Sequence, residues 1–448
     1  MSLVLRDYQV AFVADLRAAF TRGHRRVLGV SPTGSGKTAC SASMIYGAMQ
    51  RGHRSLFAAG RRELVEQTVL ALRGAGIDDI RVIQASRDDG RPDAAVIVGS
   101  IQTIAQPRWL DTLPKVQFGV LDEAAHGAAS TWVDVIRSQP DARWVGLTAT
   151  PERADGKPLE LFETIVCGPS VRSLTELGHL VPCRVWAGPA DLKPGQLAMT
   201  PLEAYLGFGS GDLAAVYCRD IAHARDELAV FRGAGIAADI VTGSAGRGDT
   251  PRDEVIARWR AGDIRVVTSV GVLTEGFDLP RLGLAILARR FNHAGQYLQV
   301  VGRILRPAPG KIGSTLVDLT GCAHDHGPPD LERIYSLTGK AISTTSRESF
   351  GQCLACGSMY IAGPRACPHC GAGIPVRSAP LPRSIGAGVT ELGPARPRSE
   401  FVVTIASKYR GTCAACGGGY KRGDQISWAT VARVARHQRC PTAAQIEP

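Results

Sequence analysis

Short apolar runs alternate with amphipathic stretches along most of the chain. Uninterrupted apolar strands that alternate with helical patterns predict parallel sheets covered by helices on both faces. About ten such strands are too many for one compact unit, and five prolines interrupt the pattern between Gly168 and Gly211. We therefore predict two α/β domains joined in that region. The apolar runs occupy residues 27–31, 55–59, 95–100, 118–122, 144–150, 214–218, 238–243, 264–269, 282–287 and 314–319.

After residue 340 the alternation stops, and two cysteine clusters follow. Residues 375–400 separate them and are rich in Pro, Gly, Arg and Ser, a composition typical of a linker. The expected domains are a first α/β domain over residues 1–172, a second over 173–345, a zinc ribbon over 346–376, a linker over 377–400 and a Cys₃His finger over 401–448.

Composition narrows the class of protein. Hydrophobic residues make up 44% of the 448 residues and charged residues 21%, which excludes a wholly disordered, collagenous or coiled-coil chain. No run of about 18 apolar residues occurs, and the N-terminus lacks a basic region followed by an apolar stretch, so we expect neither a membrane span nor a signal peptide. We expect a cytoplasmic protein. Seven of the 12 cysteines follow residue 350 in paired spacings, which favours metal ligation over disulfides.

Positive charge is concentrated near the C-terminus. Residues 346–448 hold 13 basic and 5 acidic residues, a net charge of +8, whereas the preceding residues contribute +3. A basic tail suits a polyanion such as nucleic acid. Because only 8 of the 52 basic residues are lysine, a compositional bias of the coding genome explains the charge equally well.

The segment SPTGSGKT at residues 31–38 has the context of a phosphate-binding loop, because an apolar strand precedes it and a helical stretch follows. Gly34 and Gly36 let the backbone curl so that its amides face phosphate oxygens, Lys37 can reach the β and γ phosphates, and Thr38 can ligate Mg²⁺. The consensus has Gly where Ser31 stands. The expected nucleotide contacts in this loop are Thr33, Gly34, Ser35, Gly36, Lys37 and Thr38.

The second motif is acidic and lies about 85 residues after the phosphate-binding loop, where an apolar strand ends in Asp122 and Glu123. A carboxylate at the tip of a strand beside a phosphate-binding loop can hold Mg²⁺, and its neighbour can orient and deprotonate the attacking water. Acidic pairs are common at surfaces, but the apolar strand at residues 144–150 follows at the expected distance. We therefore assign Asp122 to the metal and Glu123 to the water.

In their order along the chain these motifs resemble those of superfamily 2 helicases, nearest the DEAH-like branch that includes the motor subunit of type III restriction enzymes. The resemblance covers about residues 1–340; Ala125 departs from it where a DEAH sequence has His. The matching segments are the Gln motif (5–9), motif I (31–38), Ia (60–64), Ib (99–103), II (122–126), III (148–150), IV (216–218), V (268–278) and VI (299–306).

The resemblance implies two RecA-like domains, ATP and Mg²⁺ as ligands, and nucleic acid as partner. It implies that Gln9 reads adenine, that Gly276 and Asp278 contact the nucleotide, and that motif III couples nucleotide state to strand binding. It also implies contacts to the nucleic-acid backbone from Arg61, Ser100, Gln102, Thr103 and Thr268.

Motif VI also has a direct physical interpretation. Arg303 and Arg306 are three residues apart on a predicted helix, so they present two guanidinium groups to one spot. A planar guanidinium stabilises the charge that hydrolysis places on the γ-phosphate oxygens. Both arginines can act only if the second domain faces the phosphate-binding loop across a cleft, so domain closure becomes a condition for hydrolysis.

Two cysteine clusters predict two zinc sites. The first has two CxxC pairs ten residues apart, which suits a structural Zn²⁺. Its simplest role is to stabilise a segment too small to have a hydrophobic core of its own. The second has one CxxC pair and a HisxxCys pair among basic and aromatic residues, so it suits both zinc and nucleic acid. It is distantly similar to the DNA-break-binding finger of poly(ADP-ribose) polymerases. The expected ligands are Cys353, Cys356, Cys367 and Cys370 at the first site, and Cys413, Cys416, His437 and Cys440 at the second.

Together these features predict an ATP- and Mg²⁺-dependent nucleic-acid helicase or translocase. DNA is favoured over RNA only by analogy with the nearest branch. Two alternatives are an RNA-remodelling ATPase and a zinc-finger binding protein with a decayed motor; intact Lys37, Asp122, Glu123 and Arg306 disfavour the latter. No nuclease constellation is visible, and the zinc modules are candidate docking sites for a protein partner.

Overall fold

The computed structural model describes residues 4–374 apart from 126–129, 154, 194, 210, 244–248, 274–277, 339–342 and 345–349. Within 375–448 it describes only the backbone of short strands. The chain divides into two compact units, Met1–Val376 and Arg377–Pro448, and each is described by itself. Among the described residues no helix has the length and apolar character needed to cross a membrane.

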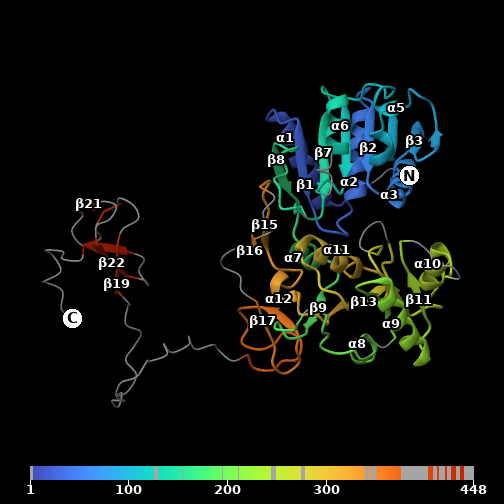
Figure 1. Cartoon of the computed structure of the whole chain (residues 1–448). Helices are drawn as coiled ribbons and strands as arrows, with labels where there is room; N and C mark the ends of the chain where they lie inside the picture. Colours follow the sequence, from blue (N-terminus) through green and yellow to red (C-terminus); the bar gives the residue numbers. More distant parts are fainter. Residues whose placement is uncertain are drawn as a thin grey trace, which may run out of the picture. The chain divides into compact units, whose positions relative to one another are not determined.

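The first unit contains two parallel sheets (Figure 1). We call residues 4–168, which hold the first sheet, lobe 1. All neighbouring strands in this sheet are parallel except the β3–β4 pair at one edge. In spatial order the strands are β4 (Arg87–Asp89), β3 (Ile80–Gln84), β5 (Val96–Ser100), β2 (Ser55–Ala59), β6 (Phe118–Asp122), β7 (Arg143–Thr148), β1 (Arg26–Val30) and β8 (Thr164–Cys167).

Helices cover both faces of this sheet, because its strands are apolar on both sides. One core cluster includes Phe12, Ile45 and Leu72 from the first three helices, and the opposite cluster includes Ile104 and Trp132. The helices are α1 (Asp7–Thr21), α2 (Lys37–Met49), α3 (Arg62–Gly74), α4 (Ile101–Ile104), α5 (Pro107–Leu110) and α6 (Ser130–Ser138).

We call residues 169–334 lobe 2. Its sheet is parallel throughout, in the order β11 (Ala238–Val241), β12 (Val266–Ser269), β10 (Leu213–Tyr217), β13 (Leu282–Leu287), β14 (Ser314–Asp318) and β9 (Cys183–Ala187). Core clusters again lie on both faces. The helices are α7 (Val171–Glu176), α8 (Pro201–Phe208), α9 (Ile221–Gly233), α10 (Arg252–Ala261), α11 (Ala294–Ile304) and α12 (Ala323–His326).

The predicted class, two parallel-sheet α/β domains, is confirmed, and every one of the ten apolar runs overlaps a strand. Four strands of these two sheets were not predicted: β3, β4, β8 and β9. β9 lies within the proline-rich stretch that we interpreted as the break between domains. The sheet of lobe 1 ends with β8, and β9 already belongs to the sheet of lobe 2.

Small antiparallel elements follow lobe 2. The short pair β15 (Arg333–Ile334) and β16 (Ser343–Thr344) precedes the hairpin of β17 (Phe350–Gln352) and β18 (Met359–Ile361), which carries the first cysteine cluster. The second unit contains a three-stranded sheet of β19 (Val402–Ala406), β22 (Gln425–Ala429) and β23 (Val434–His437), and the pair β20 (Gly411–Thr412) and β21 (Gly419–Tyr420).

Candidate active site and zinc cluster

The loop at residues 31–36 connects the end of β1 to the start of α2. Gly34 and Gly36 have φ angles of 89° and 83°, in the left-handed region that glycine adopts without steric cost. Gly36 is also the N-cap of α2, so the turn directs the first amides of the helix out of the loop. This is the geometry of a phosphate-binding helix N-terminus.

Residues of both lobes line a cavity of about 320 Å³ next to this loop. Lobe 1 contributes the loop and the end of β6, and lobe 2 contributes α11 and the residue Asp278. The structure therefore brings together residues that are far apart in the sequence. The predicted site residues in the lining are Thr33, Gly34, Gly36, Lys37, Thr38, Asp122, Glu123, Asp278, Arg303 and Arg306.

Lys37 is held against the loop that precedes it. Its Nζ donates hydrogen bonds to the carbonyl oxygens of Ser31 at 3.1 Å and Pro32 at 3.4 Å. The Ser31 hydroxyl in turn donates to the Ser35 hydroxyl at 2.7 Å, so the residue that replaces the consensus glycine braces the loop from inside. The side chain of Lys37 is thus positioned before any phosphate binds.

Opposing charges surround Lys37. Burial lowers the pKa of its ammonium group, and the guanidinium groups of Arg303 and Arg306 lower it further. The carboxylates of Glu123 and Asp122 act against both and raise this pKa. Three cationic side chains therefore face a small space, an arrangement that favours a polyanionic ligand such as a triphosphate.

The two carboxylates of motif II differ in their surroundings. Asp122 ends β6 and its side chain is largely buried, and its Oδ1 accepts a hydrogen bond from the Glu123 amide at 3.1 Å. Glu123 has a φ of 50°, an uncommon conformation for a residue other than glycine. Its Oε2 is a buried oxygen that has no hydrogen-bond partner within the described part of the chain. Such a strained residue with an unsatisfied acceptor is typical of a functional site.

Gln9 lies beside the phosphate-binding loop, with its amide engaged by protein groups. Its Nε2 donates to the Ser35 carbonyl at 2.9 Å, and its Oε1 accepts from the Arg6 amide at 3.0 Å. The Tyr8 hydroxyl donates to the same Ser35 carbonyl at 2.9 Å, a contact that the sequence did not indicate. A Cβ at Gly36 would lie 2.3 Å from the Gln9 Nε2. Gln9 thus braces the loop, and the adenine contact stays a prediction.

The helix α11 approaches the loop from lobe 2. A Cβ at Gly302 would lie 2.4 Å from the Thr33 Cβ, so only glycine permits this close approach. Arg303 is 6% exposed, and Arg306 forms an ion pair with Asp278. Both arginines line the cavity, and the ion pair holds Arg306 within lobe 2. Because α11 ends at Ile304, only Arg303 lies on the predicted helix, and Arg306 follows just beyond its end.

Three of the five predicted nucleic-acid contacts are accessible to a strand. Ser100 ends β5 and its hydroxyl donates to Gln102 Oε1 at 2.7 Å; Gln102 Nε2 donates to the Gly60 carbonyl at 3.2 Å, which connects motifs Ib and Ia. Arg61 is the N-cap of α3, in motif Ia. These three residues stay predicted contacts.

The side chains of the other two residues, Thr103 and Thr268, are buried, and their contacts stay predictions. The Thr103 hydroxyl accepts from the Ala85 amide at 3.0 Å, where Ala85 has a φ of 51°, and Thr103 is 4% exposed. Thr268 is fully buried in β12, inside the sheet of lobe 2. Neither threonine side chain therefore reaches the surface in this structure, and the Thr268 hydroxyl has no hydrogen-bond partner among the described residues.

Several predicted site residues lie outside the described residues. Gly276 is one of them, as is His126 of motif II. The ligands of the second cysteine cluster also lie outside the description. His437 is the last residue of β23, but its side chain is not described. The ligands of this cluster that lie outside the description are Cys413, Cys416 and Cys440.

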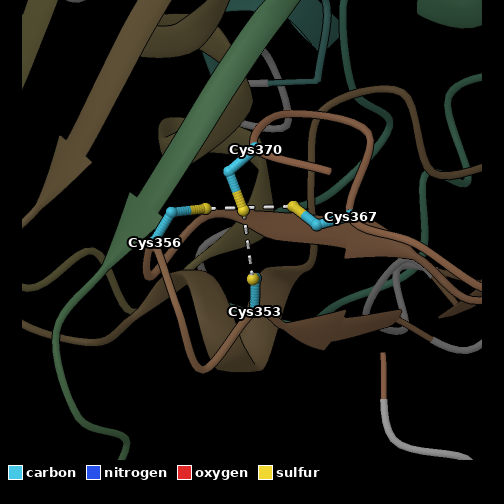
Figure 2. Close-up of side chains that lie close together, drawn as sticks. All are labelled: Cys353, Cys356, Cys367 and Cys370. Atoms are coloured by element: carbon cyan, nitrogen blue, oxygen red, sulfur yellow. Dashed lines mark hydrogen bonds between the residues drawn. The ribbon is translucent and has the colours of Figure 1, made fainter. Parts of the chain in front are cut away.

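The first cysteine cluster is fully described. Figure 2 shows the side chains of its four cysteines pointing toward one another, and their Sγ atoms all lie within 4.8 Å of one another. The Sγ atoms of Cys353 and Cys370 are 3.7 Å apart, and those of Cys356 and Cys367 are 3.8 Å apart. Four thiolates about 2.3 Å from a tetrahedral zinc ion lie about 3.8 Å from one another. The donor set therefore fits one structural Zn²⁺.

Residues 350–374, which hold the hairpin β17–β18 and the four cysteines, form a cysteine module. This module packs against the edge strand β9 of lobe 2. Trp186 and Ser358 form an antiparallel bridge, and Arg184 Nε donates to the Ser358 hydroxyl at 2.6 Å. Met359 is 2% exposed and belongs to the core of lobe 2. The module thus contacts the edge strand through one isolated bridge and covers part of an edge that would otherwise be open.

Sequence reasoning missed one further residue beside the site. Glu152 follows motif III in lobe 1, and its Oε2 accepts a hydrogen bond from the Gly295 amide of lobe 2 at 2.8 Å. An acid two residues after motif III is visible in the sequence. Its partner, however, is 143 residues away, and no local pattern indicates it.

Comparisons with known proteins agree with this geometry. Residues 2–153 match the family model described as type III restriction enzyme, res subunit, and residues 199–308 match the helicase conserved C-terminal domain. The chain is 24% identical over 362 residues to the putative ATP-dependent helicase IRC3 of Saccharomyces cerevisiae, covering 71% of this chain but only 52% of that protein. The chain thus spans about half the length of that relative.

Solved structures share the fold. The fragment structure of a putative HsdR subunit of a type I restriction enzyme from Vibrio vulnificus YJ016 has a TM-score of 0.58 and 20% identity, covering 75% of this chain and 70% of that one. S. cerevisiae Dbp5 bound to RNA and ADP BeF3 has a TM-score of 0.51 and 17% identity, covering 74% and 93%. The RecA-like character of both domains is thereby confirmed. Both family models are matched in order along the chain, which therefore carries the domains of an ATP-dependent helicase and is similar over residues 2–153 to the type III restriction enzyme res subunit.

Proposed function

We propose that this helicase hydrolyses ATP in the cleft between its lobes and uses hydrolysis to move along or separate nucleic acid. The cavity that lobe 1 lines with Lys37, Asp122 and Glu123, and lobe 2 with Arg303 and Arg306, is the observation that carries the proposal. Phosphoryl transfer needs positioning and charge stabilisation more than covalent chemistry, and these groups supply both.

Each residue has a distinct role in this proposal. The loop amides and Lys37 bind the β and γ phosphates, and Glu123 accepts the proton of the attacking water through its unsatisfied Oε2. Arg303 and Arg306 stabilise charge on the γ-phosphate oxygens. The Thr38 hydroxyl and the Asp122 carboxylate are oxygen donors of the kind that Mg²⁺ prefers and would hold that ion, which neutralises phosphate charge.

DNA is the favoured polynucleotide. Both the family model and the HsdR structure carry the name of a restriction enzyme, which supports DNA, whereas Dbp5 in its solved structure is bound to RNA. Arg61, Ser100 and Gln102 on lobe 1 are the proposed contacts to the strand. The RNA-remodelling ATPase remains the second candidate, and a direct comparison of polynucleotides separates the two.

Zinc is proposed at two places. The Cys353–Cys370 cluster would hold one ion, supported by the sulfur separations above. The Cys413–Cys440 motif would hold a second zinc ion in the basic C-terminal unit. This unit would add affinity for nucleic acid or provide a docking surface for a protein partner. This second site rests on the sequence pattern alone.

The test measures ATP hydrolysis with single-stranded DNA, duplex DNA, a fork and RNA, in the wild type and in Glu123→Gln. We expect stimulation by DNA and a loss of roughly 10² to 10⁴-fold in the turnover of Glu123→Gln, with ATP binding retained. Glu160→Gln, an exposed change elsewhere on lobe 1, is the control and should behave as the wild type. Wild-type turnover in Glu123→Gln would remove Glu123 from the mechanism, and stimulation by RNA alone would favour the second candidate.

A further inference from the structure

A buried carboxylate joins motif III of lobe 1 to the helix that carries Arg303 and ends just before Arg306. Glu152 has a side chain that is 9% exposed, and its Oε2 accepts the Gly295 amide at 2.8 Å. Its Oε1 lies 3.9 Å from His293 Nδ1. His293 is the N-cap of α11 and Gly295 is in its first turn. The carboxylate therefore sits at the N-terminus of α11 although it belongs to the other lobe.

Helix α11 depends on this acid for capping. The His293 side chain makes no capping hydrogen bond, and the first amides of a helix have no partner within it. A carboxylate at this end satisfies one amide and interacts favourably with the helix dipole. The capping group of α11 thus comes from lobe 1 and is present only when the lobes are in contact.

The contact surface on α11 requires glycine. A Cβ at Gly295 would lie 2.8 Å from the Thr150 hydroxyl and 3.5 Å from Glu152 Oε2. Thr150 is itself fixed, because its amide donates to the Thr148 hydroxyl at 3.2 Å and its carbonyl accepts from that hydroxyl at 2.8 Å. Motif III therefore forms a fixed surface against which the first turn of α11 packs.

We propose that Glu152 is a positioning residue that caps α11 across the lobe interface and so sets Arg303 and Arg306 against the phosphate-binding loop. The inference rests on the proposed ATP hydrolysis in the cleft. It adds a physical connection, through Glu152, between motif III and the arginines. Since an α-helix is stiff over three turns, a shift at Gly295 is carried to Arg303 in the last turn of α11 and to Arg306 two residues beyond its end. Strand binding that moves motif III would reach the arginines by this route.

The experiment compares Glu152→Gln, Glu152→Ala and Gly295→Ala with a matched control. Glu163→Gln serves as control, because Glu163 also accepts a backbone amide, that of Arg25 at 2.7 Å, but does so entirely within lobe 1. ATP turnover and ATP KM are measured with and without polynucleotide, together with the melting temperature.

We expect the stimulated kcat to fall about tenfold in Glu152→Ala and in Gly295→Ala, with a smaller loss in Glu152→Gln, which keeps an acceptor oxygen. ATP KM should change by less than about threefold, because the phosphate-binding loop is intact. The double variant Glu152→Ala/Gly295→Ala should lose little more than either single one, since both disrupt the same interaction. Glu163→Gln should keep the wild-type kcat even if its melting temperature falls.

Two outcomes separate this inference from the proposed function. A wild type without any polynucleotide stimulation overturns the motor and the role of Glu152 together. A stimulated wild type with unchanged kcat in Glu152→Ala and Gly295→Ala overturns the role of Glu152 alone. A kcat loss in Glu163→Gln equal to that in Glu152→Ala would show a general stability effect and also overturns it.

Discussion

The two walls of the cleft are built differently. The lobe 1 wall consists of strand ends and the loop after β1, in which Lys37 is fixed by backbone carbonyls and Glu123 by a left-handed turn. The lobe 2 wall consists of the end of α11 with Arg303, the segment after it with Arg306, and Asp278, and it comes close to the site because Gly302 packs directly on Thr33. In the proposed function, lobe 1 therefore holds the residues that bind phosphate, and lobe 2 adds positive charge whose position depends on how the lobes meet.

This difference between the two walls suggests how ATP binding and ATP hydrolysis can be assigned to different residues of one site. In the proposed function, residues held within lobe 1 bind nucleotide whatever the arrangement of the lobes. Arg303 and Arg306 of lobe 2 act only when the lobes meet as in this structure, because their distance to the phosphate changes with the arrangement. We expect mutations on the two walls to affect different steps, and the following predictions test this.

The largest effect is expected from Lys37→Ala. Removing the ammonium leaves the loop amides without the side chain that reaches the β and γ phosphates, so ATP binding should fall below detection. Equilibrium binding of a labelled nucleotide measures this directly. Lys115→Ala, also in lobe 1 but outside the site, is the control. Retained affinity in Lys37→Ala would contradict the assignment of this wall to binding.

Arg306→Lys should affect the other step. The lysine keeps the charge but loses the planar fork, so ATP binding should persist while stimulated hydrolysis falls by at least about 10³-fold, the low end for an arginine finger. Nucleotide affinity and single-turnover hydrolysis are measured on the same preparation. A loss of affinity would show that the two walls are not separable, and full hydrolysis would place the finger elsewhere.

A smaller effect is expected at the cysteine module, which belongs to the fold of lobe 2. Cys356→Ser should release one zinc ion per chain and lower the melting temperature by about 5 °C or more, because the module covers the edge strand β9. Zinc analysis and thermal unfolding measure these changes. Cys167→Ser, an exposed thiol outside the module, is the control. Full zinc content in Cys356→Ser would contradict the four-thiolate site.

The smallest effect on the motor is expected from deletion after residue 400. The full chain should contain two zinc ions and the truncated chain one, with basal hydrolysis nearly unchanged, since every residue assigned to the ATP site precedes Pro307. Affinity for nucleic acid should fall, and the slope of log affinity against log salt should flatten by about 0.9 for each phosphate that the truncated chain no longer neutralises. Unchanged affinity and slope would leave the C-terminal unit a role in partner docking or stability.

Local sequence patterns sufficed for most of the framework. Three apolar runs, at residues 55–59, 118–122 and 282–287, coincide with strands, and the loop between β1 and α2 follows from its glycines. The missed strands lack a clear pattern. β3 includes a buried Arg81, which is satisfied by an ion pair with Asp88 at 2.8 Å, and β9 lies between prolines. A charge in a strand is acceptable only once its partner is in place, and the sequence does not show the pairing.

The sequence by itself determined which chemical groups this protein has, and in which order: a phosphate loop, an acidic strand end, an arginine helix and two cysteine clusters. Only the tertiary structure decided how they act together. It buried Thr103 and Thr268, turned the Gln9 amide onto the phosphate-binding loop, packed the cysteine module on β9 and placed Glu152 on the end of α11. These contacts join segments far apart in the chain, and their formation depends on how the elements and the two lobes pack together, which local hydrophobic periodicity does not encode.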